Sequence, residues 1–538
     1  MNGLMMQQPL LISSQLEFAA RFHQSVEVVT RTVEGPIVRT TWSGLAKRVR
    51  QLANSLSASG IKRGDVVATL AWNTQRHLEL YFAVSGIGAV LHTINPRLPP
   101  DQLTYIANDA GDVMLCFDTT FLPLAKHLAS VQTPIKHFVA LTDDAHLPKD
   151  FPGLRSYESL LDGQPDTFSW PLLDENTASS LCYTSGTVGM PKGVLYSHRS
   201  TVLHSYAICM VDALAISGQD VTLPVVPMFH VNAWGVPYAA AMVGSKLVLP
   251  GPALDGVSLL DLITTEKVTS ALGVPTVWLG LLAAAKTKHV KMSTLQKVTI
   301  GGSACPPSMI TAFQEEHGAP VLHAWGMTEL SPLGTANVLL PKHASLSKEE
   351  RLQVQLKQGR PIFGIDLRLV DDDGKVVPHD GKTSGHLEAK GGWVASAYFK
   401  SDDHSHHDGE WFATGDIATI DGDGYMQITD RSKDVIKSGG EWISSIDVEH
   451  AAMLHPSIAQ AAAVGIPHPR WVERPLLVVV KHKDQDVSKE DLRVFLETKL
   501  VKWWLPDAIE FIDALPIGPT GKVLKRQLRE RFKDYALP

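Results

Sequence analysis

The hydrophobic pattern of the first two-thirds of the chain alternates short apolar runs with longer helical stretches. Val66–Trp72 is an apolar run typical of a buried strand, and Arg76–Val90 after it has the spacing of an amphipathic helix. Further strands are predicted at Val113–Phe117, His137–Leu141, Ser180–Tyr183, Leu223–Val226, Lys246–Leu249 and Lys297–Ile300. Because apolar strands separated by helices form parallel sheets with both faces covered, the pattern predicts an α/β fold.

The pattern changes after about residue 360, where short strands alternate with turn residues. These strands are expected at Ile365–Val370, His386–Lys390 and Tyr425–Thr429, and Pro341–Gln358 before them is expected to be a solvated surface connection. From Val435 the pattern is that of a compact α+β unit. Its helices are predicted near Ser445–Leu454 and Lys489–Leu500, and its strands at Ala461–Ile466 and Leu476–His482.

We therefore predict two domains. Residues 1–432 form a large domain of parallel, helix-covered sheets with a small β subdomain, and residues 433–538 form a small, mobile α+β domain. The boundary at Ser432/Lys433 is short and charged, which suits a hinge better than a flexible tether.

Composition and charge narrow the class of partner. The chain has 538 residues, of which 44% are hydrophobic and 20% charged, as in ordinary globular proteins. A formal charge of −7 gives no electrostatic reason to expect nucleic acid or an anionic membrane. The four cysteines lack metal-type spacing, the start lacks a signal peptide, and apolar stretches such as Val277–Ala285 are too short to span a bilayer. We expect a cytoplasmic protein without an integral membrane segment.

The first motif with a chemical meaning follows a predicted strand and reads Tyr183-Thr-Ser-Gly-Thr-Val-Gly-Met-Pro-Lys-Gly193. Small residues and glycines let backbone N–H groups surround phosphate oxygens, and Lys192 adds a positive charge. The motif is not a Walker A loop, because Gly193 stands where that loop needs serine or threonine. A plain glycine turn needs no such combination, so we interpret the segment as a phosphate loop.

The second motif is Ala324-Trp-Gly-Met-Thr-Glu329, again after an apolar strand, Pro320–His323. Thr328 at the strand end suits phosphate contact, Glu329 suits metal ligation, and the indole of Trp325 suits stacking on a purine. Taken alone, the hexapeptide is equally compatible with a buried tryptophan and a surface glutamate.

Two further motifs follow. Trp411-Phe-Ala-Thr-Gly-Asp416 together with Arg431 suits a clamp on ribose hydroxyls. Pro519-Thr-Gly-Lys-Val523 contains a glycine that allows a tight loop projecting Lys522 towards a developing negative charge. Taken alone, the last motif is better explained as an exposed turn lysine.

In this order and at these separations, the four motifs resemble the adenylate-forming superfamily of acyl-CoA synthetases, peptide-synthetase adenylation domains and beetle luciferases. The resemblance runs from the Val66 region to the end of the chain. Tyr196–His204, Pro227–Gly235 and Ser438–Ile443 resemble in particular the bacterial medium-chain fatty-acyl-CoA ligases and 3-(methylthio)propionyl-CoA ligases. The resemblance implies formation of acyl-AMP and pyrophosphate from ATP and a small carboxylic acid, then of acyl-CoA and AMP. It also implies ATP, Mg²⁺ and coenzyme A as cofactors, and a homodimer.

The resemblance also implies roles for individual residues. Catalytic roles fall to Lys192, Thr328, Glu329 and Lys522, with Glu329 as the magnesium ligand and Lys522 bridging the carboxylate and the α-phosphate. ATP and AMP would be bound by Thr184, Ser185, Gly186, Thr187, Gly189, Lys192, Gly302, Trp325, Gly326, Thr328, Asp416 and Arg431. The acyl group and CoA would be bound by His230, Trp234, Gly301, Gly302, Gly326, Lys437, Gly439, Gly440, Glu441 and Trp442. Lys433 aligns with the hinge residue of the family, and one departure is Val188, where threonine is more common.

The substrate is less well defined. Acetate-specific relatives carry a bulky aromatic at the position of Gly326, so glycine there implies a longer acyl chain. His230 and Trp234 are expected to face the acyl group or the thiol path, although Trp234 is equally compatible with core packing. No charged residue stands out along these segments, which favours an aliphatic or thioether chain. The sequence leaves open the length of the acyl chain and the choice between a fatty acid and a thioether acid.

Three other functions are weighed against this one. A P-loop-type NTPase would need serine or threonine after Lys192. A luciferase-like oxygenase shares the adenylation motifs, but Gly439 and Gly440 favour a route for the CoA thiol. A nucleotide-binding scaffold would require the loss of catalytic residues, and none is lost.

Overall fold

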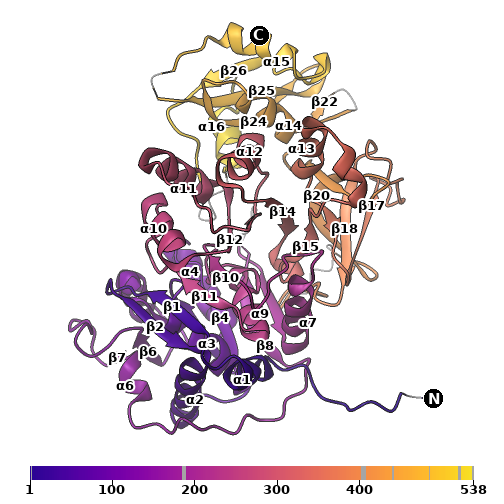
Figure 1. The fold of residues 1–538 in the computed structure, drawn as a ribbon. Helices are drawn as coiled ribbons and strands as arrows, with labels where there is room; N and C mark the ends of the chain where they lie inside the picture. Colours follow the sequence, from indigo (N-terminus) through magenta and orange to yellow (C-terminus); the bar gives the residue numbers. More distant parts are fainter. Residues whose placement is uncertain are drawn as a thin grey trace. The chain divides into compact units, whose positions relative to one another are not determined.

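The computed structural model describes residues 1, 3–184, 190–401, 407–438, 441–483, 485–518 and 523–535, with the backbone alone at positions 407, 408 and 441. The chain forms two compact units (Figure 1). The first comprises Met1–Gln355, Ile362–Asp366 and Lys390–Glu410, and the second comprises Leu356–Pro361, Leu367–Ala389 and Trp411–Pro538. Both sides of the expected boundary at 432/433 lie in the second unit, and that boundary stays a prediction.

A seven-stranded sheet in the first unit contains all four strands expected before residue 184. In spatial order the strands are β7 (Arg155–Ser156), β6 (His137–Ala140), β5 (Asp112–Phe117), β3 (Val66–Leu70), β4 (Val90–Thr93), β8 (Ala178–Tyr183) and β9 (Gly193–Ser197). Neighbouring strands pair in parallel except β8 and β9, which are antiparallel. The central strand β3 is buried at all five positions, as its unbroken apolar run predicts.

A second sheet of the first unit is built in the same way. Within this unit its strands run in the order β15 (Leu333–Ala336), β14 (Val321–Gly326), β13 (Lys297–Ile300), β12 (Ser270–Gly273), β10 (Val221–Pro224), β11 (Lys246–Leu249), β1 (Glu27–Arg31) and β2 (Ile37–Thr41). The inner pairs are parallel, whereas β1 with β2 and β14 with β15 are antiparallel. The α/β class predicted for this part of the chain is confirmed.

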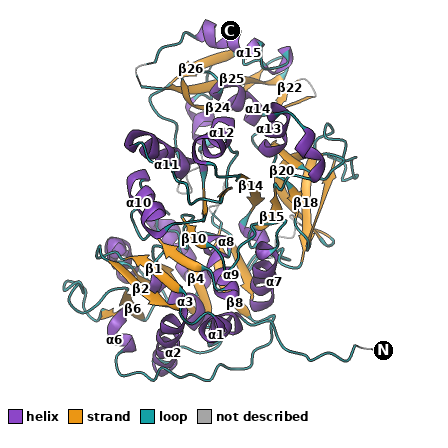
Figure 2. Cartoon of the chain, in the orientation of Figure 1, coloured by secondary structure: helices purple, strands orange, loops and turns teal. Residues whose placement is uncertain are grey.

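Helices connect these strands (Figure 2). They are α1 (Ile12–Phe22), α2 (Trp42–Ala58), α3 (Gln75–Gly86), α4 (Pro100–Ala110), α5 (Leu122–Ser130), α6 (Tyr157–Leu161), α7 (His198–Cys209), α8 (Val231–Trp234), α9 (Val236–Val243), α10 (Gly256–Glu266), α11 (Pro275–Lys288), α12 (Pro307–Ala312) and α13 (Lys348–Leu356). Short 3₁₀ or π turns lie at Thr119–Phe121, Phe313–His317, Thr328–Leu330, Pro341–Ser345 and Lys502–Trp504. Side-chain caps begin several helices, as at Thr41, Thr74 and Ser197.

Two expectations about helices need correction. The helix expected at Arg76–Val90 ends at Gly86, and all of its residues except Arg76 are buried because α1 and α2 pack against it. It is therefore a core helix and not an amphipathic one. The connection expected at Pro341–Gln358 is largely exposed to solvent, as predicted, but it also contains helix α13, which the sequence did not predict.

The second unit contains a small antiparallel sheet. Its main strands are β17 (Ile365–Val370), β18 (Gly385–Gly391), β20 (Trp411–Ile420) and β21 (Met426–Arg431). The two-residue strand β16 (Arg360–Pro361) is not part of this sheet, and the two-residue strand β19 (His407–Asp408) lies in the first unit. β20 pairs antiparallel with both β18 and β21. The strand expected at Ile365–Val370 has the predicted bounds, because turn residues mark both of its ends.

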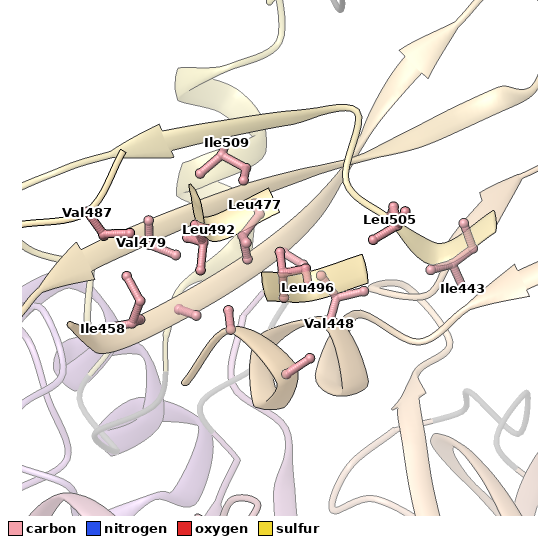
Figure 3. Packing of buried hydrophobic residues seen from close by; sticks show 14 of the residues in the cluster. Ile443, Val448, Ile458, Leu477, Val479, Val487, Leu492, Leu496, Leu505 and Ile509 are labelled. Carbon is pink, nitrogen blue, oxygen red and sulfur yellow. The ribbon is translucent and has the colours of Figure 1, made fainter. Parts of the chain in front are cut away.

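The C-terminal part of the second unit is the predicted α+β unit. A sheet of β23 (Glu441–Ile443), β22 (Ile436–Ser438), β25 (Val472–Lys481) and β24 (Ile458–His468), with β26 (Ala508–Phe511) beside β25, is accompanied by α14 (Ser445–Met453), α15 (Lys489–Glu497) and α16 (Lys525–Arg531). Figure 3 shows its core, in which Leu477 and Val479 from the sheet meet Leu492 and Leu496 of α15. Both long strands begin several residues before the predicted points. None of the helices in the described part of the chain is long and apolar enough to cross a membrane.

Candidate active site

The phosphate-loop motif is carried by a hairpin between β8 and β9. Tyr183 and Gly193 pair directly across the two strands, and the N–H of Thr184 donates to the carbonyl of Lys192 at 2.9 Å. The hairpin thus holds both ends of the motif close together. Four predicted ligands, Ser185, Gly186, Thr187 and Gly189, lie outside the described residues, and their roles stay predictions.

A buried pair of ionisable groups, His92 and Asp112, supports the base of this hairpin through Tyr183. His92 Nδ1 lies 2.9 Å from an oxygen of Asp112, and both side chains are inaccessible to solvent. The ring of Tyr183 lies 5.0 Å from that of His92, and its hydroxyl donates to Asp109 at 2.5 Å. Burial raises the pKa of Asp112, while the neighbouring imidazole opposes that rise. Of these residues only Tyr183 belongs to the motif, and nothing in the sequence distinguishes His92, Asp109 or Asp112.

Thr328 and Glu329 lie on a tight turn that directly follows β14. The turn is fixed from two other segments: the Tyr196 hydroxyl donates to the carbonyl of Thr328 at 2.6 Å, and the N–H of Ala395 donates to the carbonyl of Glu329 at 2.7 Å. Both side chains are largely buried, with 7% of Thr328 and 6% of Glu329 exposed. A buried carboxylate at a strand end is costly unless it has a polar partner or a cation.

The structure brings Lys192 and Glu329 to the same aromatic residue, Tyr398. The Tyr398 hydroxyl donates to Glu329 Oε1 at 2.6 Å, and the Lys192 ammonium lies 4.8 Å from the centre of the Tyr398 ring. Two of the predicted catalytic residues, 137 positions apart in sequence numbering, therefore contact one side chain. Tyr398 was missed from the sequence because a tyrosine in a short, mostly apolar segment carries no distinguishing signal.

Trp325 and Gly326 have structural surroundings that the sequence did not reveal. The indole of Trp325 is buried and packs on Gly334, where an added Cβ would lie 2.4 Å from the ring. A Cβ on Gly326 would lie only 2.1 Å from the carbonyl oxygen of Pro332. Glycine is needed there because β15 approaches so closely, and it is not in itself a sign of an open acyl channel. The assignments of Trp325 to the purine and of Gly326 to the nucleotide and acyl sites stay predictions.

The expected acyl-pocket segment forms a turn of left-handed backbone. From Val231 to Gly235 the φ angles are 46°, 49°, 48°, 58° and 73°. Such a conformation costs about 1–2 kcal/mol at each non-glycine residue, so the surroundings must hold it in place. The side chain of Asn232 holds the turn with two hydrogen bonds. Its Nδ2 donates to Ser180 Oγ at 2.9 Å, and its Oδ1 accepts from the Thr93 hydroxyl at 3.4 Å.

This turn places Trp234 against Gly301, as a shared pocket wall requires. A Cβ on Gly301 would lie 3.1 Å from the Trp234 indole, which is itself partly exposed. His230, at the start of the turn, is also partly exposed, and Gly302 lies beyond β13 with a φ of 82°. The turn thus brings two of the predicted acyl-site residues together, and the roles of all four stay predictions.

His204 supports this region from α7. Its Nε2 accepts from the N–H of Leu333 at 3.2 Å, and its ring meets Trp393 edge-on at 6.0 Å. Burial lowers the pKa of His204 to about 3, so the imidazole is neutral at physiological pH. His204 belongs to the Tyr196–His204 motif, which predicts no role for it, and in the structure it packs within the buried core.

In the second unit, Asp416 and Arg431 are brought together as the ribose clamp requires. They are direct partners across β20 and β21, and Arg431 Nε lies 2.8 Å from Asp416 Oδ1. Asp416 is 1% exposed, and its backbone N–H donates to Thr414 Oγ1 at 3.1 Å. Their role towards ribose stays a prediction.

The expected CoA-facing residues are only partly described. Lys437 and Trp442 pair across β22 and β23, with the ammonium 6.0 Å from the indole ring. The Trp442 ring also meets His386 edge-on at 5.6 Å. Gly439, Gly440 and Lys522 lie outside the described residues, and only the backbone of Glu441 is described.

Lys433 lies in the turn between β21 and β22, where its side chain is exposed. Just before it, the N–H of Ser432 donates to the carbonyl of Gly415 at 3.0 Å. Just after it, Asp434 forms an ion pair with Arg529 of α16. The predicted hinge is therefore flanked by contacts on both sides, and its role stays a prediction.

The chain is similar to known proteins over its whole length. The family described as AMP-binding enzyme matches residues 16–399, and the one described as AMP-binding enzyme C-terminal domain matches residues 447–522. A 3-methylmercaptopropionyl-CoA ligase of Ruegeria lacuscaerulensis is 54% identical over 99% of each chain. A medium-chain-fatty-acid–CoA ligase of Ectopseudomonas oleovorans is 51% identical over 100% of this chain and 98% of its own.

Solved structures agree with these relatives. The crystal structure of an anthranilate CoA ligase in complex with anthranoyl-AMP matches with a TM-score of 0.86 at 26% identity, covering 98% of both chains. The resemblance drawn from the motifs is confirmed. On its motifs, its parallel sheets and these matches, the chain belongs to the AMP-binding enzyme family.

Proposed function

We propose that this chain is an AMP-forming acid–CoA ligase that activates a short- to medium-chain carboxylic acid. The observation that carries the proposal is the convergence of Lys192 and the buried carboxylate of Glu329 on Tyr398. Such a pair offers a cation for phosphate oxygens and an anion for a metal, which is what a site for a nucleoside triphosphate needs. The relatives at 54% and 51% identity are CoA ligases by name.

In the first half-reaction a carboxylate oxygen of the acid attacks the α-phosphorus of ATP. The bond from that phosphorus to the bridging oxygen breaks, and pyrophosphate leaves with the electron pair. Two anions must approach each other, so the site has to supply positive charge. We assign this positive charge to Lys192 and Lys522. We further propose that Thr328 contacts the α-phosphate, that Asp416 and Arg431 bind the ribose, and that Trp325 stacks on the purine.

The residues present fit a magnesium ion bound together with ATP. Magnesium usually takes one or two carboxylates and completes its shell with phosphate oxygens and water. Glu329 suits this sparse donor set, and no cluster of three or more His, Cys, Asp or Glu among the described residues competes with it. When bound, the ion would neutralise charge on the phosphates, while Glu329 holds it in place.

In the second half-reaction the sulfur of CoA attacks the acyl carbonyl carbon. The bond to the phosphate oxygen of AMP breaks, AMP leaves, and the thiol proton passes to solvent. We assign the thiol path to Lys437, Gly439, Gly440, Glu441 and Trp442. Rotation about Lys433 would exchange this face for the one that carries Lys522.

The acyl group is proposed to lie against Trp234, Gly301, Gly302 and His230. The contact between Trp234 and Gly301 supports this, because it places an apolar wall beside a residue without a side chain. The alternative substrate is 3-(methylthio)propionate, favoured by the name of the relative at 54% identity. A panel of acids from propionate to dodecanoate, together with 3-(methylthio)propionate, separates a fatty acid from a thioether acid as the substrate. CoA-ester formation is measured for each acid, and the preferred acid should have the highest kcat/KM of the panel.

One measurement tests the reaction class. The enzyme should release pyrophosphate and not orthophosphate, and only when a carboxylic acid is present. Orthophosphate release without acid would instead support a P-loop-type NTPase, and oxygen consumption with acyl-AMP would support a luciferase-like oxygenase. We further propose that the protein is cytoplasmic and that it forms a homodimer. Light scattering on the purified protein tests the dimer, because the measured mass should be twice the 58.6 kDa of the chain.

A further inference from the structure

Residues 395–399 join two parts of the proposed ATP site that come from distant segments. The N–H of Ala395 donates to the carbonyl of Glu329 at 2.7 Å, and the N–H of Phe399 donates to the carbonyl of Gly193 at 2.8 Å. Between these two backbone bonds, the side chain of Tyr398 contacts both Glu329 and Lys192. One short segment therefore links the turn that carries the glutamate to the hairpin that carries the lysine.

The two contacts of Tyr398 act on different properties of its neighbours. The hydroxyl, 2.6 Å from Glu329 Oε1, fixes the orientation of the carboxylate and leaves its second oxygen to accept another ligand. The ring face, 4.8 Å from the Lys192 ammonium, restricts where that flexible side chain lies. Tyr398 is 8% exposed, so both interactions are only weakly screened by water.

We propose that Tyr398 is a positioning residue that sets the metal-dependent affinity for ATP. Its hydroxyl orients Glu329 towards the metal, and its ring holds Lys192 ready for the phosphates. Tyr398 itself touches neither substrate nor metal in this scheme, and the inference rests on the proposed function.

The experiment compares two substitutions of this tyrosine. Tyr398→Phe removes the hydroxyl and keeps the ring, whereas Tyr398→Leu removes both. The matched control is Tyr157→Phe, which breaks a buried tyrosine–glutamate bond of the same 2.6 Å length, from Tyr157 to Glu79, outside the proposed ATP site. Calorimetry measures the Kd of ATP for each full-length variant with Mg²⁺ and with EDTA.

The expected pattern separates the two contacts. Tyr398→Phe should raise the Kd of ATP about 10-fold with Mg²⁺ and by less than about twofold in EDTA, because one hydrogen bond to a charged group is lost. Tyr398→Leu should weaken ATP binding in EDTA as well, by about threefold, since the lysine loses its aromatic partner. Tyr157→Phe should leave both Kd values unchanged while lowering the urea midpoint of unfolding.

Two results would overturn the inference. One is a Tyr398→Phe variant that binds ATP as the wild type does in the presence of Mg²⁺. The other is equal weakening with Mg²⁺ and with EDTA, which would mean that the tyrosine supports the fold in general, as Tyr157 does. Carboxylate-dependent pyrophosphate release by the wild type is measured in parallel. If the wild type releases no pyrophosphate, the proposed function fails. If it does release pyrophosphate, but the Kd of ATP in Tyr398→Phe depends on Mg²⁺ as in the wild type, only the role of Tyr398 is refuted.

Discussion

Gly326 permits the sharpest test of the site geometry. In Gly326→Ala the new Cβ would lie 2.1 Å from the carbonyl oxygen of Pro332 and 2.8 Å from its carbonyl carbon, whereas ordinary contact begins at 3.4 Å. The obstacle is backbone, so β15 must move by more than an ångström. Gly326 pairs with Leu333 of that strand, and the pairing weakens with the movement. Overpacking of this kind costs about 3 kcal/mol, at the upper end of its usual range.

Equilibrium unfolding in urea measures the cost, with Gly280→Ala as the control. Gly280 lies in α11, and the nearest atom to its added Cβ is 3.9 Å away. That variant should be stabilised by about 0.5–1 kcal/mol, because alanine restricts the unfolded chain and favours a helix. Gly326→Ala should also lower kcat/KM by a similar factor for every acid tested, because Thr328 and Glu329 lie in the turn between β14 and the displaced β15.

The result that refutes this reasoning is a stable Gly326→Ala variant whose preference moves towards acetate and propionate. The side chain at position 326 would then enter the acyl channel, as the comparison with acetate-specific relatives first suggested. A loss of stability with an unchanged chain-length profile supports the steric explanation.

Three further predictions concern the proposed catalytic cycle and the effect of pH. Lys522→Ala should lose about 10²–10³-fold in acyl-AMP formation but far less in transfer from preformed acyl-AMP to CoA, and equal losses would contradict its role. Lys433→Pro should retain adenylation and lose thioester formation, because proline fixes φ at a hinge; unimpaired CoA-ester synthesis would place the hinge elsewhere. Acidification from pH 6.5 should lower the urea midpoint, because burial lowers the pKa of four histidines from 6.5 to about 3–4 and the folded state keeps them neutral. Each proton taken up by the unfolded chain costs about 1.4 kcal/mol per pH unit, and a midpoint constant between pH 6.5 and 4.5 would contradict the burial. These histidines are His77, His198, His204 and His450.

Local patterns in the sequence determined many of the sheet strands. The strands at Lys246–Leu249, Lys297–Ile300 and Ile365–Val370 have the predicted bounds, because a short apolar run between turn residues contains all the information that defines them. The phosphate-loop motif and the Asp416–Arg431 pair were likewise visible in the sequence. Their residue types carry the chemistry. The fold class accounts for the phosphate loop at the end of β8, whereas Asp416 lies within β20.

The tertiary structure decided which residues support the site and which glycines are structural. Tyr398 became visible only when Lys192 and Glu329 were found on either side of it, since the three residues come from separate segments. The left-handed turn at Val231–Gly235 has no sequence signal, because four of its five residues are not glycine and only buried contacts such as that of Asn232 hold it.

Gly326 shows the difference most clearly. The sequence determined that the position has no side chain, and that absence was compatible with either an open channel or a crowded backbone. The choice depends on where β15 passes, which is set by long-range packing and not by neighbouring residues. A sequence specifies local preferences and chemical groups, whereas the distance between two segments is determined only when the whole core has packed.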